Sequence, residues 1–377
     1  MNDNYNLPPI FYTTMSDNFE SFVEDLAESK NSEFSPPFDS YIPYKGDMFS
    51  YLDQFFSSYL NKLRSFSNED IKRLGSTMQN IVFQYGPDHF NKRFDLIKDT
   101  TDISKAILSS INQHYAGRPF DGFETMEKVL TKNQFHLLHL LPTLMIDKSL
   151  LLYRVRNQKK IKEQKELFHI PFEKRSKCSS ERYSIPGYPS LYLSESLETA
   201  IRETNVKGHK YSASCFQLNT SGLKLIDLSL PNRELNITDK YCLLVFYPLI
   251  VACGLKVKDS SGSYKPEYII PQDLFLAIRL HYNGIDGVSY TSTKYPHPNF
   301  KNDNERNYVL YVRHTEKESG YSEELAKLLK FTTPYSPKFY ENIKKTESKI
   351  KRKPFLEFSP NKIIDWNNIE TNIFLSL

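Results

Sequence analysis

The sequence predicts an α+β protein in which an all-helical N-terminal part precedes a mixed α/β domain. Apolar residues recur at helical spacing through residues 47–145, whereas short β-type runs alternate with helical stretches through residues 146–320. The chain has 377 residues, which is too long for one core of usual size. We expect residues 1–46, rich in Pro, Ser, Asn and acids, to be a flexible or loosely docked arm, and residues 321–377 to be a helical and basic tail.

Periodicity and end signals place the elements in order. Ser67 is expected to cap the second helix of the N-terminal part, which Gly86-Pro87 ends. The breaks at Gly117-Arg118-Pro119 and at Pro142 limit later helices. The expected helices are 49–66, 68–85, 102–115, 122–141, 197–204, 238–253, 271–282 and 323–331, and the expected strands are 151–155, 190–193, 211–218, 223–228, 287–290 and 308–312.

Composition excludes several classes of protein. The net charge of +4 is close to balance, so nucleic-acid binding is unlikely. The four cysteines form no C-x-x-C pair, which argues against a zinc or redox motif, and we expect no metal. The longest apolar run, Cys242–Cys253, is too short to span a bilayer, and the N-terminus lacks the pattern of a signal peptide. We therefore expect a cytoplasmic protein without a membrane partner.

The most informative stretch is Phe168–Glu203, which predicts a loop, a Gly-Pro-rich turn, a strand and a helix. Alternation along the strand puts Leu191 and Leu193 on one face and Tyr192 on the other. If the leucines face the core, Tyr192 faces a cleft.

The residue types in this region suit cleavage of an N-glycosidic bond to a cationic leaving group. Such a site needs a cation to hold a diphosphate, an aromatic surface, and a carboxylate that stabilises an oxocarbenium-like ribose or positions the nucleophile. Arg154, Tyr192 and Glu203 supply these types. On types alone the pattern is weak, because Arg, Tyr and Glu occur in most folds.

The order of motifs YRVR, FHIPF, RYSIPGYPSLYLSESLETAIRE, YIIPQ, GIDGVSYTS and YVLYV resembles the RES domain family, named for its Arg, Glu and Ser. The resemblance covers about residues 150–313. Its members include NAD+-degrading toxins of toxin–antitoxin pairs, on a fold similar to ADP-ribosyltransferases. The positions that match the family motifs are Tyr153, Arg154, Arg182, Tyr183, Gly187, Pro189, Tyr192, Glu203, Asp286, Gly287, Tyr290 and Ser292.

The resemblance implies catalytic roles for Glu203, Arg154 and Tyr192. The sequence departs from the family pattern at the Ser, because the segment where that Ser is expected, Glu267–Gln272, contains no Ser. Either Gln272 or Ser292 is then the polar counterpart. The implied substrate-binding residues are Arg182, Tyr183, His169, Gln272 and Ser292. Arg182 could instead anchor the turn, and His169 could be structural.

The resemblance implies cleavage of NAD+ at the nicotinamide–ribose bond, by a glycohydrolase using water or a phosphorylase using phosphate, as a toxin or phage-defence effector. NAD+ would be the substrate, with no further cofactor. The alternatives are transfer of ADP-ribose to a macromolecule and a non-catalytic RES-like interaction protein. An antitoxin or regulatory protein and a homo-oligomer are the partners to consider. Residues 1–145 are expected to control activity, by shielding the cleft or by building an oligomer.

Overall fold

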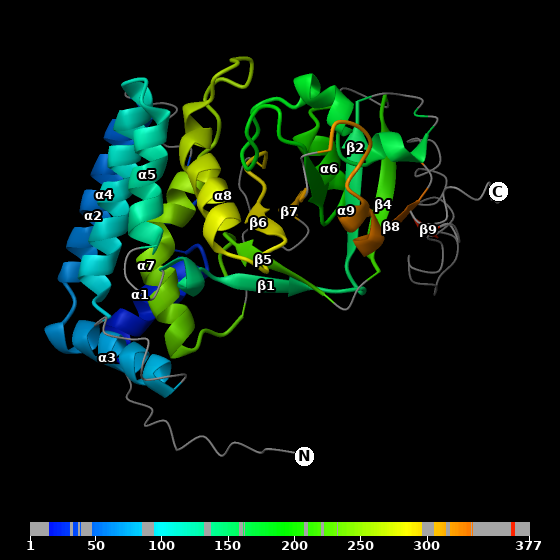
Figure 1. The fold of residues 1–377 in the computed structure, drawn as a ribbon. Helices are drawn as coiled ribbons and strands as arrows, with labels where there is room; N and C mark the ends of the chain where they lie inside the picture. Colours follow the sequence, from blue (N-terminus) through cyan, green and yellow to red (C-terminus); the bar gives the residue numbers. More distant parts are fainter. Residues whose placement is uncertain are drawn as a thin grey trace, which may run out of the picture.

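The helical N-terminal part and a mixed sheet are the two main features of the fold (Figure 1). The computed structural model describes residues 15–30, 33–36, 38, 47–84, 94–131, 137–157, 161, 163–206, 210–219, 222–231, 233–295, 305–313, 317–332, 334 and 363–365. Helices and one sheet together confirm the α+β class.

Five helices come first: α1 (Asp17–Ala27), α2 (Met48–Arg64), α3 (Asn68–Gln84), α4 (Leu96–Tyr115) and α5 (Pro119–Thr131). The expected cap of α3 is confirmed, because the Asp70 amide donates to Ser67 Oγ over 3.0 Å. The expected end of that helix at residues 86–87 lies outside the described residues.

Among the described residues, nine strands form one sheet in the order β1-β5-β6-β7-β3-β2-β4-β8-β9. In this sheet β5 and β6 pair in parallel, and the other neighbouring strands pair antiparallel. The six expected strands correspond to β2–β7 and lie next to one another in this sheet. Their bounds are β1 (Thr143–Ile146), β2 (Leu151–Arg156), β3 (Ser190–Ser194), β4 (Ser212–Leu218), β5 (Leu223–Asp227), β6 (Gly287–Thr291), β7 (Arg306–Tyr311), β8 (Leu329–Thr332) and β9 (Ile363–Asp365).

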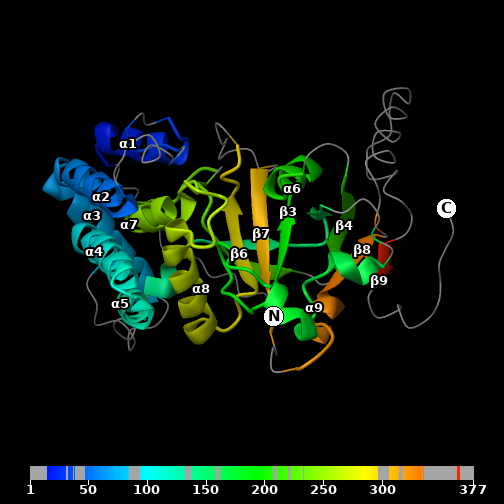
Figure 2. The same cartoon turned by 90° about the horizontal axis from the view of Figure 1, so that it is seen from above.

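Four further helices belong to the second part: α6 (Leu197–Glu203), α7 (Ile237–Gly254), α8 (Ile269–His281) and α9 (Glu323–Leu328). Figure 2 shows α7 and α8 between the N-terminal helices and the sheet. One hydrophobic cluster runs from α1 and α2 through α7 and α8 to β6 and β7. A second cluster covers the opposite face of the sheet, beneath α9. Apolar burial therefore joins the N-terminal helices to the α/β part in a common core.

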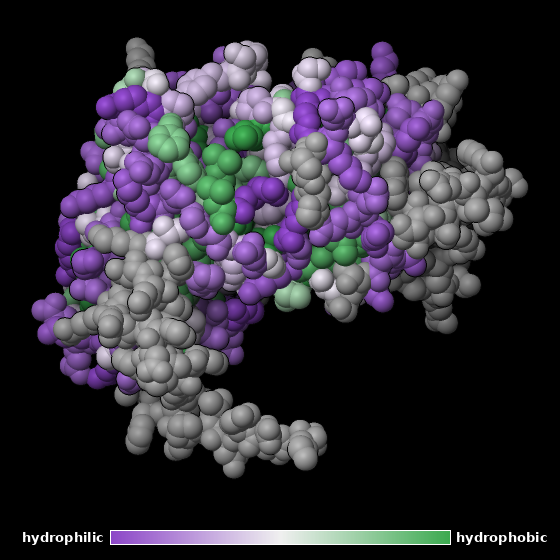
Figure 3. Space-filling model, in the orientation of Figure 1, coloured by the Kyte–Doolittle hydropathy of each residue, from purple (hydrophilic) through white to green (hydrophobic). Residues whose placement is uncertain are grey.

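The apolar run at Cys242–Cys253 is part of α7, which is long and apolar enough to cross a membrane by length and composition alone. The apolar run itself has 12 residues, and the helix that contains it has 18. In the fold, 72% of this apolar helix is buried inside the protein, because other helices and the sheet surround it. Figure 3 shows that the hydrophobic surface on the front face gathers in the region of α8 instead.

Three segments differ from the expectations. Residues 17–27 form α1, whose Phe19, Val23 and Leu26 are fully buried, so this part of the expected arm is firmly packed. In place of the expected helix over 122–141, α5 ends at Thr131 and a short 3₁₀ helix covers Leu137–Leu140 before β1. The expected helix over 323–331 ends at Leu328, where the chain turns into β8 and pairs with β4. The ring of Phe331 stacks on that of Phe216 of β4, and this contact stabilises the segment as a strand of the sheet.

The sheet narrows between β2 and β3, where the two strands share a single residue pair, Tyr153 with Ser194. On their other sides both strands pair over most of their length, β2 with β4 and β3 with β7. Side chains beyond the shared pair therefore face a gap between the strands, and this gap holds the candidate site.

Candidate active site

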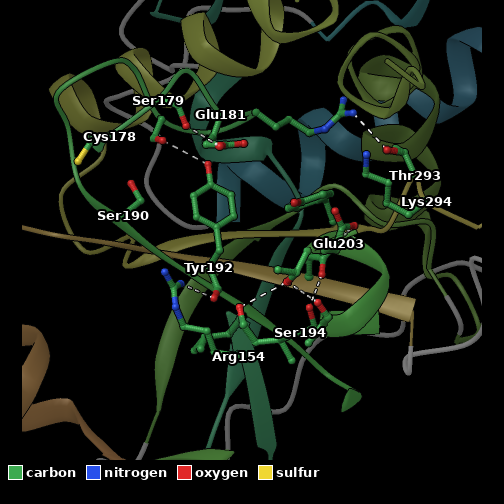
Figure 4. Close-up of a pocket in the computed structure, with 18 of the residues that line it drawn as sticks. Arg154, Cys178, Ser179, Glu181, Ser190, Tyr192, Ser194, Glu203, Thr293 and Lys294 are labelled. Carbon is green, nitrogen blue, oxygen red and sulfur yellow. Dashed lines mark hydrogen bonds between the residues drawn. The ribbon is translucent and has the colours of Figure 1, made fainter. Parts of the chain in front are cut away.

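A cavity of about 270 Å³ lies where β2 and β3 separate. The described residues that line it fall between 153 and 307, and come from both strands, from the turn before β3, from the end of α6 and from the segment after β6. A cavity of this size is near the lower end for small-molecule sites. Figure 4 shows Arg154, Tyr192 and Glu203 around it.

Tyr192 lies on the cavity side of β3, as alternation along the strand predicts. Leu191 and Leu193 are buried in the cluster on the opposite face. The Tyr192 hydroxyl accepts from the Tyr183 amide at 3.1 Å and donates to Ser184 Oγ at 3.4 Å. Burial raises the pKa of Tyr192, so the phenol stays neutral at physiological pH. The turn before β3 thus fixes the ring within the cavity.

Arg154 lies on β2 and reaches across the gap to β3. Its Nη1 donates to the Tyr192 carbonyl oxygen over 2.8 Å. Its Nε is buried and has no hydrogen-bond partner among the described residues. Burial, and then the neighbouring Arg156, lower the pKa of Arg154 to about 9. The guanidinium therefore remains a cation at neutral pH, with donor capacity that an anion in the cavity could use.

Glu203 ends α6, a short helix that begins where Ser196 Oγ accepts from the Thr199 amide. Two donors hold the carboxylate, Ser292 Oγ and Asn307 Nδ2, each 2.6 Å from Oε1. The second oxygen, Oε2, has no hydrogen-bond partner within the described part of the chain. One oxygen is therefore fixed by the protein while the other remains for a ligand.

Ser292 is fully buried, directly after β6. Its hydroxyl donates to Glu203 and accepts from the Lys294 amide at 3.2 Å. Of the two expected counterparts of the family Ser, only Ser292 touches the candidate catalytic carboxylate. It lies behind Glu203, where it orients that side chain.

Arg182 and Tyr183 support the turn more than they face a ligand. Arg182 is 5% exposed, and its guanidinium donates to the Cys253 and Leu255 carbonyls over 2.7 and 2.9 Å. These bonds tie the turn to the end of α7, which corresponds to the anchoring alternative. The ring of Tyr183 is fully buried and packs 5.0 Å from that of Tyr290.

His169 and Gln272 lie outside the lining of the cavity. His169 is 1% exposed, with Nδ1 donating to the Ile170 carbonyl and Nε2 accepting from the Ser322 amide at 2.9 Å. Burial lowers the pKa of His169 to about 4, so the ring is neutral. The amide of Gln272 contacts the turn before β3, as described further below. Both residues are placed to support the fold, and their expected contact with substrate stays a prediction.

Sequence reasoning missed Asn307 and Ser194. Ser194 Oγ donates to Asn307 Oδ1 over 2.7 Å, which directs the amide nitrogen of Asn307 toward Glu203. The register of β3 with β7 pairs these two residues. The sequence signal for Asn307 is a polar residue directly before the apolar strand 308–312. Its contact with Glu203 depends on pairing between distant strands, which the sequence does not reveal. Within the described ranges, no group of three or more His, Cys, Asp or Glu side chains could hold a metal ion.

The fold and the cavity define an α+β protein with a candidate active site built on a carboxylate, an arginine and a tyrosine. Residues 151–325, a little under half of the chain, match the RES domain. This matched stretch follows the helical part and β1, and β8 and β9 come after it.

Two known proteins are similar to part of the chain. The chain is 31% identical over 196 residues to YopC of Bacillus subtilis (strain 168), which is named as a candidate toxin. That match covers 48% of this chain and 44% of the relative, so the chain spans less than half the relative's length. A crystal structure of the M. tuberculosis MbcT–MbcA toxin–antitoxin complex aligns with 15% identity, over 52% of this chain and 90% of that chain, with a TM-score of 0.29.

Proposed function

We propose that the protein cleaves NAD+ at the bond between nicotinamide and ribose. The observation that carries this proposal is the state of Glu203, whose Oε1 is fixed by two donors while Oε2 remains without a partner among the described residues, in a cavity that also contains Arg154 and Tyr192. A carboxylate held in this way can stabilise positive charge that develops nearby.

The chemistry of the bond explains why a carboxylate is needed and a general acid is not. Nicotinamide in NAD+ carries a positive charge on its ring nitrogen. When the C1′–N1 bond breaks, the bonding electrons pass to that nitrogen, and nicotinamide leaves neutral and without a proton. The positive charge then develops on the ribose, at C1′ and its ring oxygen. Glu203 Oε2 would stabilise this charge, or orient the nucleophile that attacks C1′.

Arg154 suits the diphosphate of NAD+. The buried guanidinium has an Nε donor without a partner among the described residues, and its Nη1 donates to the Tyr192 carbonyl oxygen. A phosphate oxygen would satisfy that donor and compensate the charge. Tyr192 would contribute an aromatic surface, with its hydroxyl fixed by the turn.

The acceptor would be water, giving ADP-ribose, or phosphate, giving ADP-ribose 1-phosphate. In each case the oxygen of the acceptor bonds to C1′ and loses a proton to solvent or to Glu203. The named relative supports the further proposal that this activity makes the protein a toxin. We also propose that it acts on the NAD+ of the cytoplasm and is restrained by an antitoxin.

Product analysis tests the proposal. The purified full chain is incubated with NAD+, with and without inorganic phosphate, and the products are identified by mass spectrometry. We expect free nicotinamide together with ADP-ribose or its 1-phosphate. Intact NAD+ under both conditions would contradict the proposal. Nicotinamide with ADP-ribose attached to protein or nucleic acid would show transfer to a macromolecule instead.

A further inference from the structure

The turn before β3 is the part of the cavity wall that has the least regular structure. We define the cavity turn as residues 178–187. It contributes five lining residues, Cys178, Ser179, Glu181, Arg182 and Ser184. It also holds Tyr192 in place through the Tyr183 amide and the Ser184 hydroxyl. Its ends are joined by the Gly187 amide, which donates to the Cys178 carbonyl over 3.0 Å.

Gln272 on α8 fastens the middle of the cavity turn. Its Nε2 lies 2.8 Å from Ser180 Oγ, 2.8 Å from the Glu181 carbonyl oxygen and 3.2 Å from the Ser184 carbonyl oxygen. Two of these three acceptors are carbonyl oxygens, so the nitrogen of the Gln272 amide, and not its oxygen, faces the turn. The turn is therefore held from two sides, by α8 through Gln272 and by the end of α7 through Arg182.

The next residue of α8, Asp273, contacts the N-terminal helices. Asp273 is 2% exposed. Its Oδ2 accepts from the fully buried Ser110 Oγ over 2.6 Å, and its Oδ1 lies 3.2 Å from His114 Nε2. Ser110 and His114 are one turn apart on α4. A buried carboxylate held by two groups of α4 fixes the register of α8 against that helix, since loss of either partner leaves buried charge uncompensated.

We propose that α8 is a rigid relay through which the N-terminal helices position the cavity turn. One end of the relay is the contact of Asp273 with Ser110 and His114, and the other is the contact of Gln272 with the turn. The two residues are consecutive on a helix, so a shift of one displaces the other. Gln272, Asp273 and Ser110 are positioning residues in this scheme. The described lining of the cavity contains no residue of 1–145. The N-terminal helices would therefore act on the site by setting its geometry and not by contacting a ligand.

A cysteine reports the position of the turn without any substrate. Cys178 begins the cavity turn, lines the cavity and is 8% exposed. Its labelling by a small thiol reagent, followed by peptide mass spectrometry, measures opening of the turn. Cys215 and Cys242, which are also buried but lie outside the turn, report global unfolding in the same sample.

We expect Gln272→Ala, Ser110→Ala and Asp273→Asn each to accelerate labelling of Cys178 about tenfold, the effect of losing one buried hydrogen bond. Labelling of Cys215 and Cys242 should not change. The three variants should also raise the KM for NAD+ more than they lower kcat, because Tyr192 is displaced while Glu203 keeps both donors. The double variant Ser110→Ala/Gln272→Ala should be no worse than Gln272→Ala alone, since the relay is already broken.

Glu127→Gln is the matched control. Glu127 on α5 accepts from His281 at the last residue of α8, so it too joins α8 to the N-terminal helices. This contact, at His281, lies more than two helical turns from Gln272 along α8. We expect any loss of stability in this variant to leave Cys178 labelling and KM unchanged.

The inference uses the proposed function only for its kinetic readout. Expected labelling together with intact NAD+ would overturn the proposed function and support the relay. Unchanged Cys178 labelling in Ser110→Ala and Asp273→Asn would overturn the relay, as would acceleration of the same size in Glu127→Gln. If Asp273→Asn labels at all cysteines because it unfolds, the milder Ser110→Ala decides.

Discussion

Replacing Ser292 by Ala tests whether the hydrogen bond behind Glu203 serves the reaction. The hydroxyl is 2.6 Å from Glu203 Oε1 and fully buried, so its loss removes one of two donors to a carboxylate. A hydrogen bond to a charged group contributes about 1.5–3 kcal/mol. If that contribution is realised when positive charge develops on ribose, the rate of nicotinamide release should fall about 10- to 150-fold.

The assay is initial-rate release of nicotinamide by the purified chain under saturating NAD+. Thr291→Val is the matched control, because Thr291 is the preceding residue and its buried Oγ1 has no hydrogen-bond partner in the described structure. We expect less than a twofold change in that variant. In a Glu203→Gln background, Ser292→Ala should have almost no further effect. An equal loss in both backgrounds would refute the reasoning, since Ser292 would then act without Glu203.

Three further predictions follow from the same geometry. Arg154→Lys retains the charge but loses the planar guanidinium that reaches the Tyr192 carbonyl, so the KM for NAD+ should rise at least about tenfold; an unchanged KM would assign the diphosphate to another cation. Arg182→Met should lower the free energy of unfolding, measured in urea, by about 3 kcal/mol, because it leaves the Cys253 and Leu255 carbonyls without their donor. The pKa of His169 is about 4 in the folded state against about 6.5 in the unfolded state, so between these pH values the unfolded state binds more protons. Lowering the pH from 7 to 5 should therefore cost the wild-type chain about 2 kcal/mol of stability, a loss that His169→Gln should not show. Equal pH dependence of stability in both proteins would contradict this.

The strands of the α/β part could be predicted closely, because their signals are local. Alternation in Ser190–Ser194 gave both the strand and the outward direction of Tyr192, and the structure confirms both. The capping signal at Ser67 was equally local. Where competing signals are long-range, prediction failed. Residues 329–332 have a helical pattern, yet stacking of Phe331 on Phe216 draws them into the sheet.

The candidate site divides in the same way. Arg154, Tyr192 and Glu203 could be selected from the chain because each lies in a recognisable motif, and the fold brings all three to one cavity. The contacts behind them could not be selected. Asn307 reaches Glu203 only because β3 and β7 pair in one particular register, and Arg182 is an anchor only because α7 ends beside the turn. Pairings between residues more than 70 positions apart leave no periodic trace in the sequence.

The domain boundary expected near residue 145 shows most clearly what could not be predicted from the sequence. Apolar stripes on α2 and α3 predicted helices but not their partners. In the structure α7 enters the same cluster, and the Tyr59 hydroxyl donates to the Leu244 carbonyl over 2.9 Å. A chain shortened to begin near Asp147 would expose that face of α7, so we expect it to lose solubility.

We propose that cleavage of the bond between nicotinamide and ribose depends on the carboxylate of Glu203, which stabilises the developing positive charge or orients the nucleophile. The most direct measurement is nicotinamide release from NAD+ by the wild-type chain, by Glu203→Gln and by Glu198→Gln. Glu198 is the matched control, since it lies on the same helix but is exposed and pairs with Arg202 at 3.0 Å. We expect wild-type rates in Glu198→Gln and a loss of at least about a hundredfold in Glu203→Gln. Equal rates in all three proteins would contradict the claim.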